Sequence, residues 1–272
     1  MTVAIRPELP IWMINLPRAT ARRAAMEAGL KRIGITDYRL FPGIDGKTEA
    51  EHLAKSVDIP LFERNMGRRI LWGGIACYHS HLAVWREFLA TDAPFALILE
   101  DDVVFHDDFV AAVETGLRGS EHWDFLKLNC IRAKLPIAQG RLGDYRLNAY
   151  LGPATGTAAY LIKRETAAKL LSVMLPVTRA TDHEINRFFA HDFRLFGLEP
   201  FPSHVDDEGQ SLITGASFGD VAKFPKLQRL PHYALKAANY FRRGWWLLRK
   251  GFLRSQPGRI LALTPEDEGR AR

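Results

Sequence analysis

The stretch "PFALILEDDVVF", residues 94–105, is the one from which the rest of this chain can be interpreted. Phe95–Leu99 is an unbroken apolar run, typical of a strand buried on both faces. Three acids, Glu100–Asp102, follow it before the apolar run resumes at Val103–Phe105. Carboxylates are rarely buried without a partner, and adjacent negative charges oppose one another's ionisation. Either the acids end a strand in a solvated loop, or they bind a divalent cation such as Mg2+ or Mn2+.

Similar apolar runs recur along the chain and alternate with segments of helical periodicity. Strands are predicted at 11–16, 38–42, 95–100, 123–129, 157–162 and 195–200, and helices at 19–34, 73–90, 107–117, 164–171 and 181–193. This alternation predicts an α/β layer fold with a mostly parallel central sheet flanked by helices. In such sheets ligands bind beyond the carboxyl ends of the strands, which is where Glu100–Asp102 fall.

The composition is that of an ordinary globular protein, with 272 residues of which 47% are hydrophobic and 25% charged. There is no run of 18 uncharged apolar residues, and the N-terminus lacks the pattern of a secretory signal. Cys77 and Cys130 are too few for a disulfide framework and fit a reducing cytosol, although one bridge between them stays open. Their spacing does not indicate zinc.

The positive charge of the chain is concentrated near its C-terminus. Residues 223–259 contain ten Lys or Arg and no Asp or Glu, so the other residues carry 27 basic against 31 acidic side chains. This asymmetry divides the sequence into a globular domain, 1–220, and a basic helical extension, 221–272. No nucleic-acid-binding motif accompanies the extension, so we expect no nucleic acid partner.

An apolar stripe runs through that extension at helical spacing. Its members are Ala238, Phe241, Trp245, Leu248 and Phe252. Aromatic and aliphatic side chains opposite Lys and Arg suit an amphipathic helix that lies in an anionic membrane surface. The alternative is a helix docked on the protein's own core with its basic face in water.

Four blocks of the sequence resemble glycosyltransferase family 25, the lipopolysaccharide-type galactosyl- and glucosyltransferases related to collagen galactosyltransferases. They are "MINLPRATARR" (13–23), "FPGIDGK" (41–47), "GGIACYHSHLAVWREFLATDAPFALILEDDVVF" (73–105) and "TGTAAYLIKRETAAKLL" with "TDHEI" (155–171, 181–185). The third is the most specific, although "GGIAC" stands where the family has "GEIGC". The resemblance covers roughly residues 11–215 and implies a GT-A fold and inverting transfer from a UDP-hexose.

The resemblance also implies a metal site. GT-A enzymes hold a divalent cation with a D-x-D motif at a strand end, and Glu100–Asp102 supplies the same spacing. We expect Asp102 to bind Mn2+ or Mg2+ directly, Glu100 to face the ribose or a metal-bound water, and Asp101 to face the donor sugar. His204 is the candidate for a further metal ligand; the alternative is a solvated loop histidine.

Two acids in "TDHEI", Asp182 and Glu184, are the candidates for the general base that takes the proton of the acceptor hydroxyl. The alternative is an N-cap acid with a Glu in the first helical turn. Donor contacts are expected from Ile14, Asn15, Leu16, Arg22, Ser80, His81 and Glu100. Arg22 could instead lie on a solvated helix face, and Ser80 with His81 could cap a helix start.

Together these expectations describe a metal-dependent, cytoplasmic enzyme on the inner face of a membrane. It would transfer galactose or glucose from a UDP-sugar to a glycan or glycolipid acceptor such as lipopolysaccharide core. One alternative is a sugar-nucleotide nucleotidyltransferase or phosphohydrolase, although the first strand lacks the Gly-rich loop of a pyrophosphorylase. Another is a catalytically silent homologue that binds glycans in adhesion.

Overall fold

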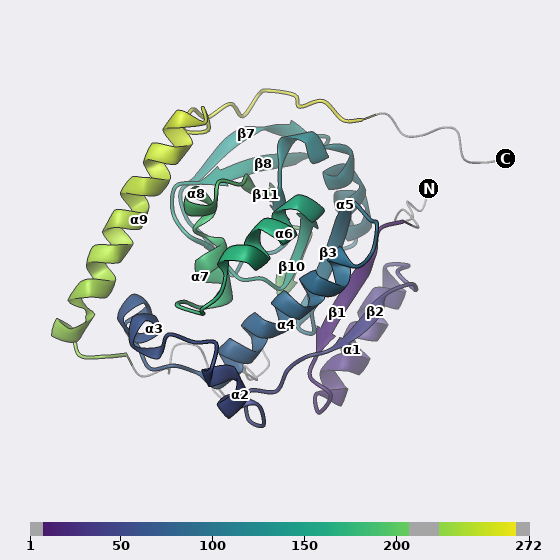
Figure 1. The fold of residues 1–272 in the computed structure, drawn as a ribbon. Helices are drawn as coiled ribbons and strands as arrows, with labels where there is room; N and C mark the ends of the chain where they lie inside the picture. Colours follow the sequence, from purple (N-terminus) through teal and green to yellow (C-terminus); the bar gives the residue numbers. More distant parts are fainter. Residues whose placement is uncertain (1–7, 207–222, 265–272) are drawn as a thin grey trace.

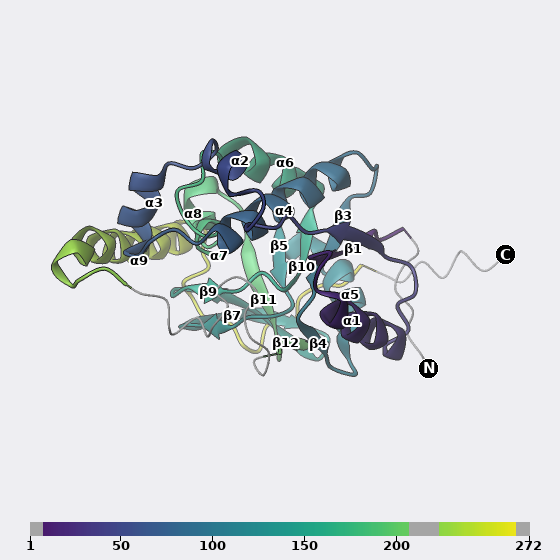
Figure 2. The same cartoon turned by 90° about the horizontal axis from the view of Figure 1, so that it is seen from below.

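An eight-stranded sheet with helices on both faces forms the centre of the protein (Figures 1 and 2). The computed structural model describes residues 8–206 and 223–264. The order of strands is β2 (Arg39–Pro42), β1 (Ile11–Asn15), β3 (Phe95–Glu100), β10 (Ala159–Lys163), β5 (Phe125–Lys127), β11 (Leu195–Glu199), β8 (Tyr145–Tyr150) and β7 (Pro136–Leu142). The predicted α/β class is therefore confirmed.

The predicted direction of the strands was wrong, because the sheet is mixed. The β1–β2, β1–β3 and β5–β11 pairs are parallel, whereas β10 is antiparallel to β3 and β5, and β8 is antiparallel to β11 and β7. A parallel pair needs a long crossover, usually a helix. Between β5 and β10 the chain instead forms β6 (Arg132–Ala133), β7, β8 and β9 (Ala154–Thr155). These strands were missing from the sequence prediction.

Helices lie on both faces of the sheet (Figure 2). On one face lie α4 (Trp72–Leu89) and α6 (Arg164–Val173), and on the other lie α1 (Thr20–Arg32) and α5 (Phe109–Arg118). The indole of Trp85 in α4 donates to the Tyr160 hydroxyl of β10, which fixes this helix against the middle of the sheet.

The remaining helices differ from the prediction in length. The segment 48–66, expected as loop or short helix, contains α2 (Ala50–Ala54) and α3 (Ile59–Met66). The helix expected over 181–193 is divided into α7 (Thr181–Ile185) and α8 (Phe188–His191). The division matters because α7 carries Asp182 and Glu184, while α8 packs against the C-terminal helix.

That C-terminal helix, α9 (Leu230–Arg249), runs alongside α3 and α8 (Figure 1). Arg243, Trp246 and Leu247 are buried against the body of the protein, and the chain that follows pairs with β7 through a 2.8 Å bond from Arg141 N to Arg259 O. The predicted domain boundary between residues 220 and 221 lies outside the described residues. Within the described ranges, no helix is long and apolar enough to cross a bilayer.

The predicted apolar stripe is only partly covered. Phe241, Trp245 and Leu248 are 75%, 56% and 55% exposed. Phe252 instead contacts the ring of Phe196, with 5.1 Å between centroids. The helix thus docks through a face adjacent to the stripe, and most of the stripe meets solvent.

Candidate functional site

The acidic turn Glu100–Asp102 lies where β1 and β3 end side by side. Glu100 is the last residue of β3, and its Cα is paired with that of Ile14 in β1. This register places Asn15 beside the turn, where its Nδ2 donates to Asp101 Oδ2 at 2.7 Å. The next residue, Leu16, leaves the strand. The first sequence block and the acidic turn therefore meet, as expected from the carboxyl ends of parallel strands.

Arg22 reaches the same turn from α1. Its Nη1 donates to Asp101 Oδ1 at 2.8 Å, and its Nη2 lies 3.6 Å from Asp102 Oδ2. It is therefore not on a solvated helix face. Burial raises the pKa of Asp101, whereas Arg22 and Asn15 act in the opposite direction. Both carboxylate oxygens of Asp101 therefore accept a hydrogen bond from the protein.

Glu100 ends a chain of hydrogen bonds that crosses from α4 to β10. Trp85 Nε1 lies 2.9 Å from the Tyr160 hydroxyl, which lies 2.9 Å from His81 Nδ1, and His81 Nε2 lies 3.1 Å from Glu100 Oε1. An indole can only donate, so Tyr160 donates its own proton to Nδ1, and Nε2–H donates to Glu100. Thr157 Oγ1 also donates to Oε1 at 2.5 Å.

These donors decide the charge of Glu100. Burial disfavours the carboxylate, but the hydrogen bonds from His81 and Thr157 outweigh it and lower the pKa of Glu100 below its ordinary value. Glu100 is therefore an ionised acid whose Oε1 is held by the protein.

Asp102 has the opposite environment, although it is two residues away. Its Oδ1 is buried and accepts no hydrogen bond. Burial, followed by the negative charge of Glu100, raises the pKa of Asp102 to about 7. A divalent cation at Oδ1 would provide the missing partner and favour the ionised form, so the donor set of this turn fits a hard metal best at Asp102. Asp206 adds an acid nearby, because its N–H donates to the Asp102 carbonyl at 2.9 Å.

A softer cluster lies next to this position. In the described part of the chain, one group of three potential ligands comes within 4.8 Å: Cys77, His81 and Glu100. His81 Nε2 carries a proton in the hydrogen-bond chain above, and burial raises the pKa of the Cys77 thiol well above its ordinary value. Both groups would have to lose a proton before they could bind a metal, so this cluster suits a cation less well than Asp102 does.

The candidate base Asp182 lies on α7 and is half-buried. Its Oδ2 accepts from Gly156 N at 3.3 Å and its Oδ1 from His183 N at 2.8 Å. Gly156 directly precedes Thr157, the residue that donates to Glu100. One short segment, Thr155–Thr157, therefore contacts both Glu100 of the acidic turn and the candidate base Asp182.

Glu184, the other candidate base, points into a cluster of cations. Its carboxylate lies 2.7 Å from Arg187, 2.8 Å from His191 and 3.2 Å from Arg179. Burial opposes its ionisation, but hydrogen bonding to His191 and the two guanidinium charges lower the pKa of Glu184. A carboxylate held by two guanidinium groups and a histidine is a poor proton acceptor, so the geometry favours Asp182 as the base.

The predicted helix cap at Ser80 and His81 was wrong. Helix α4 begins at Trp72, so both residues lie in its interior. The Ser80 hydroxyl donates to Ala76 O at 2.9 Å and accepts from Ile44 N at 2.9 Å, the usual use of a serine inside a helix. His81 contacts the acidic turn through Glu100.

His204 lies on β12 (Ser203–Val205), which pairs with β4 (Val103–Phe105) directly after the acidic turn. Its Nδ1 is 2.9 Å from His106 Nε2. The imidazole of His204 is exposed, and its role as a ligand stays a prediction.

Two cationic residues of the site were missed from the sequence. Lys127, the last residue of β5, is 1% exposed, and its Nζ donates to the Gly156 carbonyl. A lysine inside the apolar run Phe125–Leu128 was the available signal. Arg68 has a buried Nη1 without a partner; burial lowers its pKa, and the charge of Asp182 opposes that shift. In the sequence, nothing distinguishes Arg68 from Arg69.

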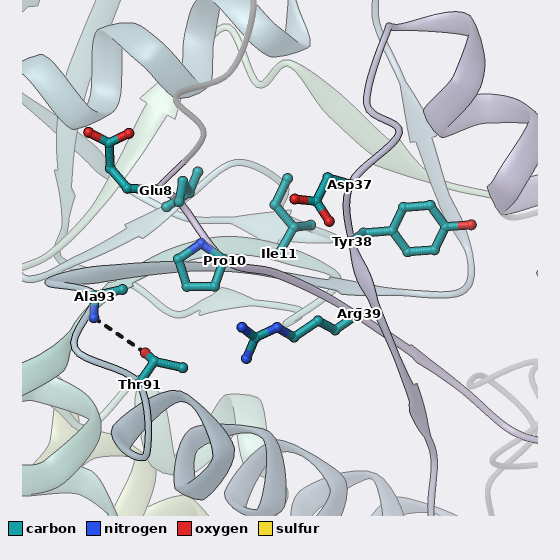
Figure 3. Close-up of a pocket in the computed structure, with 9 residues that line it drawn as sticks. Glu8, Pro10, Ile11, Asp37, Tyr38, Arg39, Thr91 and Ala93 are labelled. Atoms are coloured by element: carbon teal, nitrogen blue, oxygen red, sulfur yellow. Dashed lines mark hydrogen bonds between the residues drawn. The ribbon is translucent and has the colours of Figure 1, made fainter.

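A cavity of about 290 Å3 lies elsewhere, where β1, β2 and β3 begin (Figure 3). Glu8, Asp37, Arg39 and Thr91 line it. The guanidinium of Arg39 also lies 5.0 Å from the ring centroid of Trp12. Because the acidic turn is at the other ends of these strands, the cavity is separate from the site.

Comparison with known proteins places the site in context. The model of "Glycosyltransferase family 25 (LPS biosynthesis protein)" matches residues 8–185, which include the acidic turn and Asp182. A procollagen galactosyltransferase 1-A of Xenopus laevis is 27% identical over 225 residues, covering 73% of this chain and 37% of that protein. A glycosyltransferase 25 family member of Aedes aegypti is 29% identical over 168 residues, covering 59% and 27%.

Another relative, the inactive glycosyltransferase 25 family member 3 of Mus musculus, is 24% identical over 229 residues, covering 74% and 38%. This chain thus spans between 27% and 38% of the length of these curated relatives. Helix α9 lies outside the residues that the family model matches.

Proposed function

The chain belongs to glycosyltransferase family 25, and on that premise we propose that it transfers galactose or glucose from a UDP-sugar to a glycan hydroxyl with inversion. The observation that carries the proposal is Asp102, whose buried Oδ1 has no partner within the protein. A buried carboxylate oxygen without a partner is costly to a folded protein, so its presence at a strand end favours a bound cation.

The proposed cation is Mn2+ or Mg2+, held by Asp102 with Glu100 nearby and His204 as a further ligand. When bound, it would neutralise the diphosphate leaving group. The protein's own contribution is Arg22, whose guanidinium lies beside Asp101 and Asp102 and can form paired hydrogen bonds to diphosphate oxygens. In this proposal Asn15 and Asp101 orient Arg22 and the donor sugar.

Asp182 acts as the base. Its carboxylate accepts the proton of the acceptor hydroxyl while the hydroxyl oxygen forms a bond to the anomeric carbon. The bond from that carbon to the diphosphate oxygen breaks, and the electron pair leaves with UDP. Attack from the face opposite the leaving group inverts the anomeric centre. The half-buried position of Asp182 supports this role, because the group is both held and accessible.

The first test is a donor screen of the purified protein. UDP-galactose and UDP-glucose should be consumed in the presence of Mn2+ or Mg2+ and an oligosaccharide acceptor, and a chelator should stop the reaction. GDP- and CMP-sugars serve as controls for the nucleotide. Consumption of UDP-sugars at an unchanged rate in excess chelator would overturn the proposed metal site.

A glycan-binding role without catalysis is the second candidate, because some relatives are named inactive. It predicts acceptor binding without UDP release from any donor. Family membership argues against the nucleotidyltransferase alternative, which predicts release of pyrophosphate in place of UDP.

We also propose that the protein works at the cytoplasmic face of a membrane, on a lipid-linked glycan such as lipopolysaccharide core. The support is α9, where the exposed Phe241, Trp245 and Leu248 lie among exposed cations. The exposed Lys and Arg side chains on this helix are Lys236, Arg242 and Arg249. Each Lys or Arg near an anionic bilayer contributes about 1 kcal/mol, and the apolar side chains add a contribution that salt does not screen.

This proposal is tested by co-sedimentation with vesicles. Wild-type protein should bind vesicles containing anionic lipid, fail to bind neutral ones, and be released only in part by high salt. Changing Phe241, Trp245 and Leu248 to Ser should abolish binding. Val173→Ser is the matched control, because Val173 is also an exposed apolar side chain but lies on α6. Unchanged binding of the triple variant would overturn the membrane proposal.

A further inference from the structure

The segment Thr155–Thr157 joins the two halves of the site through a residue that must be glycine. Gly156 has a φ of +97°, in the left-handed region that glycine favours. A Cβ at this position would lie 3.1 Å from a side-chain carbon of Ile131. The backbone conformation of Gly156 decides where its N–H points, and that N–H is the group that contacts Asp182.

Lys127, the last residue of β5, contacts this glycine. Its Nζ donates to the Gly156 carbonyl, and no ion pair joins it to a carboxylate of the described residues. Burial lowers the pKa of Lys127 below its ordinary value. Burying an ammonium group without an ion pair is costly, and an apolar side chain of similar size would often give a more stable protein. The position of this lysine is therefore better explained by function than by stability.

We infer that Lys127 is a positioning residue for the base: by binding the Gly156 carbonyl it fixes the left-handed conformation that directs the Gly156 N–H to Asp182. The inference rests on the proposed role of Asp182. The carbonyl that Lys127 holds and the N–H that contacts Asp182 belong to successive peptides, which are linked through the φ and ψ angles of Gly156. Without the lysine the glycine can leave its left-handed conformation, and Asp182 then loses a hydrogen bond that orients its carboxylate. A misdirected base slows proton transfer but leaves the donor's binding groups at Glu100–Asp102 in place.

The test variant is Lys127→Met, which keeps the length of the side chain and removes both its charge and its donor. We expect a melting temperature equal to or above that of the wild type, since a buried unpaired charge is lost. We expect kcat to fall about 10-fold or more, with the KM for the UDP-sugar within about twofold of wild type. Lys127→Gln, which keeps an N–H donor without a charge, should recover part of the lost kcat.

Two comparisons separate positioning from a general structural role. In an Asp182→Asn background, Lys127→Met should cause no further fall in kcat, because the group it positions is already lost. Thr157→Val removes the donor to Glu100 at the other end of the same segment, and should raise the donor KM more than it lowers kcat.

The inference is overturned by wild-type kcat in Lys127→Met, by an undiminished further loss in the Asp182→Asn background, or by a fall in melting temperature that parallels kcat in both Lys127 variants. These results are distinct from failure of the proposed function. Wild-type turnover in Asp182→Asn would overturn the assignment of the base itself. Loss in that variant with normal turnover in Lys127→Met overturns the present inference alone.

Discussion

Asp102 and Glu184 are both largely buried acids, yet the protein treats them in opposite ways. Glu184 has Arg179, Arg187 and His191 around it, and its pKa is lowered. Asp102 has a buried oxygen without a partner, and its pKa is raised to about 7. The difference teaches which acid is structural: a carboxylate whose partners are all present within the chain stabilises the fold, whereas one left incomplete fits a ligand from outside.

The largest expected effect concerns turnover. Asp102→Asn should lower kcat/KM by about 10³-fold or more, because the neutral amide cannot support a cation beside the diphosphate. Asp107→Asn is the matched control, since Asp107 follows Asp102 closely in the sequence but is 97% exposed and pairs with Arg32. Steady-state assays measure both variants. Near-normal rates in Asp102→Asn would contradict the proposed difference between Asp102 and Glu184.

The second effect concerns folding and should fall on the other acid. Glu184→Gln leaves Arg179 and Arg187 buried without their counter-charge, so we expect a loss of about 3–5 kcal/mol in the free energy of unfolding. Denaturant titration measures the free energy of unfolding of Glu184→Gln and of Asp102→Asn. A Glu184→Gln variant as stable as wild type would contradict the structural role of this cluster.

A smaller effect separates the two acids by pH. The pKa of Asp102 is raised from 3.8 to about 7 on folding, so its contribution to stability is fully present below pH 4 and is lost as the pH rises towards 7. Asp102→Asn removes this loss, and the metal-free variant should be more stable than wild type at pH 8 by on the order of 1–3 kcal/mol. Melting temperatures of wild type and Asp102→Asn at pH 4, 6 and 8 test this expectation. A difference in melting temperature that does not depend on pH would count against a raised pKa of Asp102.

The smallest effect comes from the far end of the hydrogen-bond chain. Tyr160→Phe removes the donor to His81 Nδ1, so the imidazole is no longer held in the form that donates to Glu100. We expect the KM for the donor to rise about threefold to tenfold, as for loss of one hydrogen bond to a charged group. Phe125→Leu, which alters the ring stacked on Tyr160 but no hydrogen bond, is the control. Equal effects of the two changes would mean that packing, not the tautomer, is responsible.

What could be predicted from the sequence was local. The apolar run before Glu100 predicts a buried strand, and adjacent acids at its end predict a cation site. The strands β7 and β8 were missed because Gln139, Arg141, Arg146 and Asn148 interrupt their apolar residues, and with them the antiparallel direction of β10 was missed.

The contacts that distinguish the three acids of the turn could not be read from spacing. His81 and Tyr160 are 79 residues apart, and only the packing of α4 on β10 brings them together. In α9 the periodicity located the apolar stripe, but the face that docks contains the buried cation Arg243, whose guanidinium donates to the backbone of Leu151 and Asn186. A buried arginine bound to carbonyl oxygens has no signature in hydrophobic periodicity.

The central claim is that Asp102 is incomplete without a cation, and the binding of Mn2+ in the presence of UDP tests it most directly. Calorimetric titration should show binding to the wild type and to Asp107→Asn, and at least a 100-fold loss of affinity in Asp102→Asn, since the direct ligand is removed. Equal Mn2+ affinity in wild type and Asp102→Asn would contradict the account.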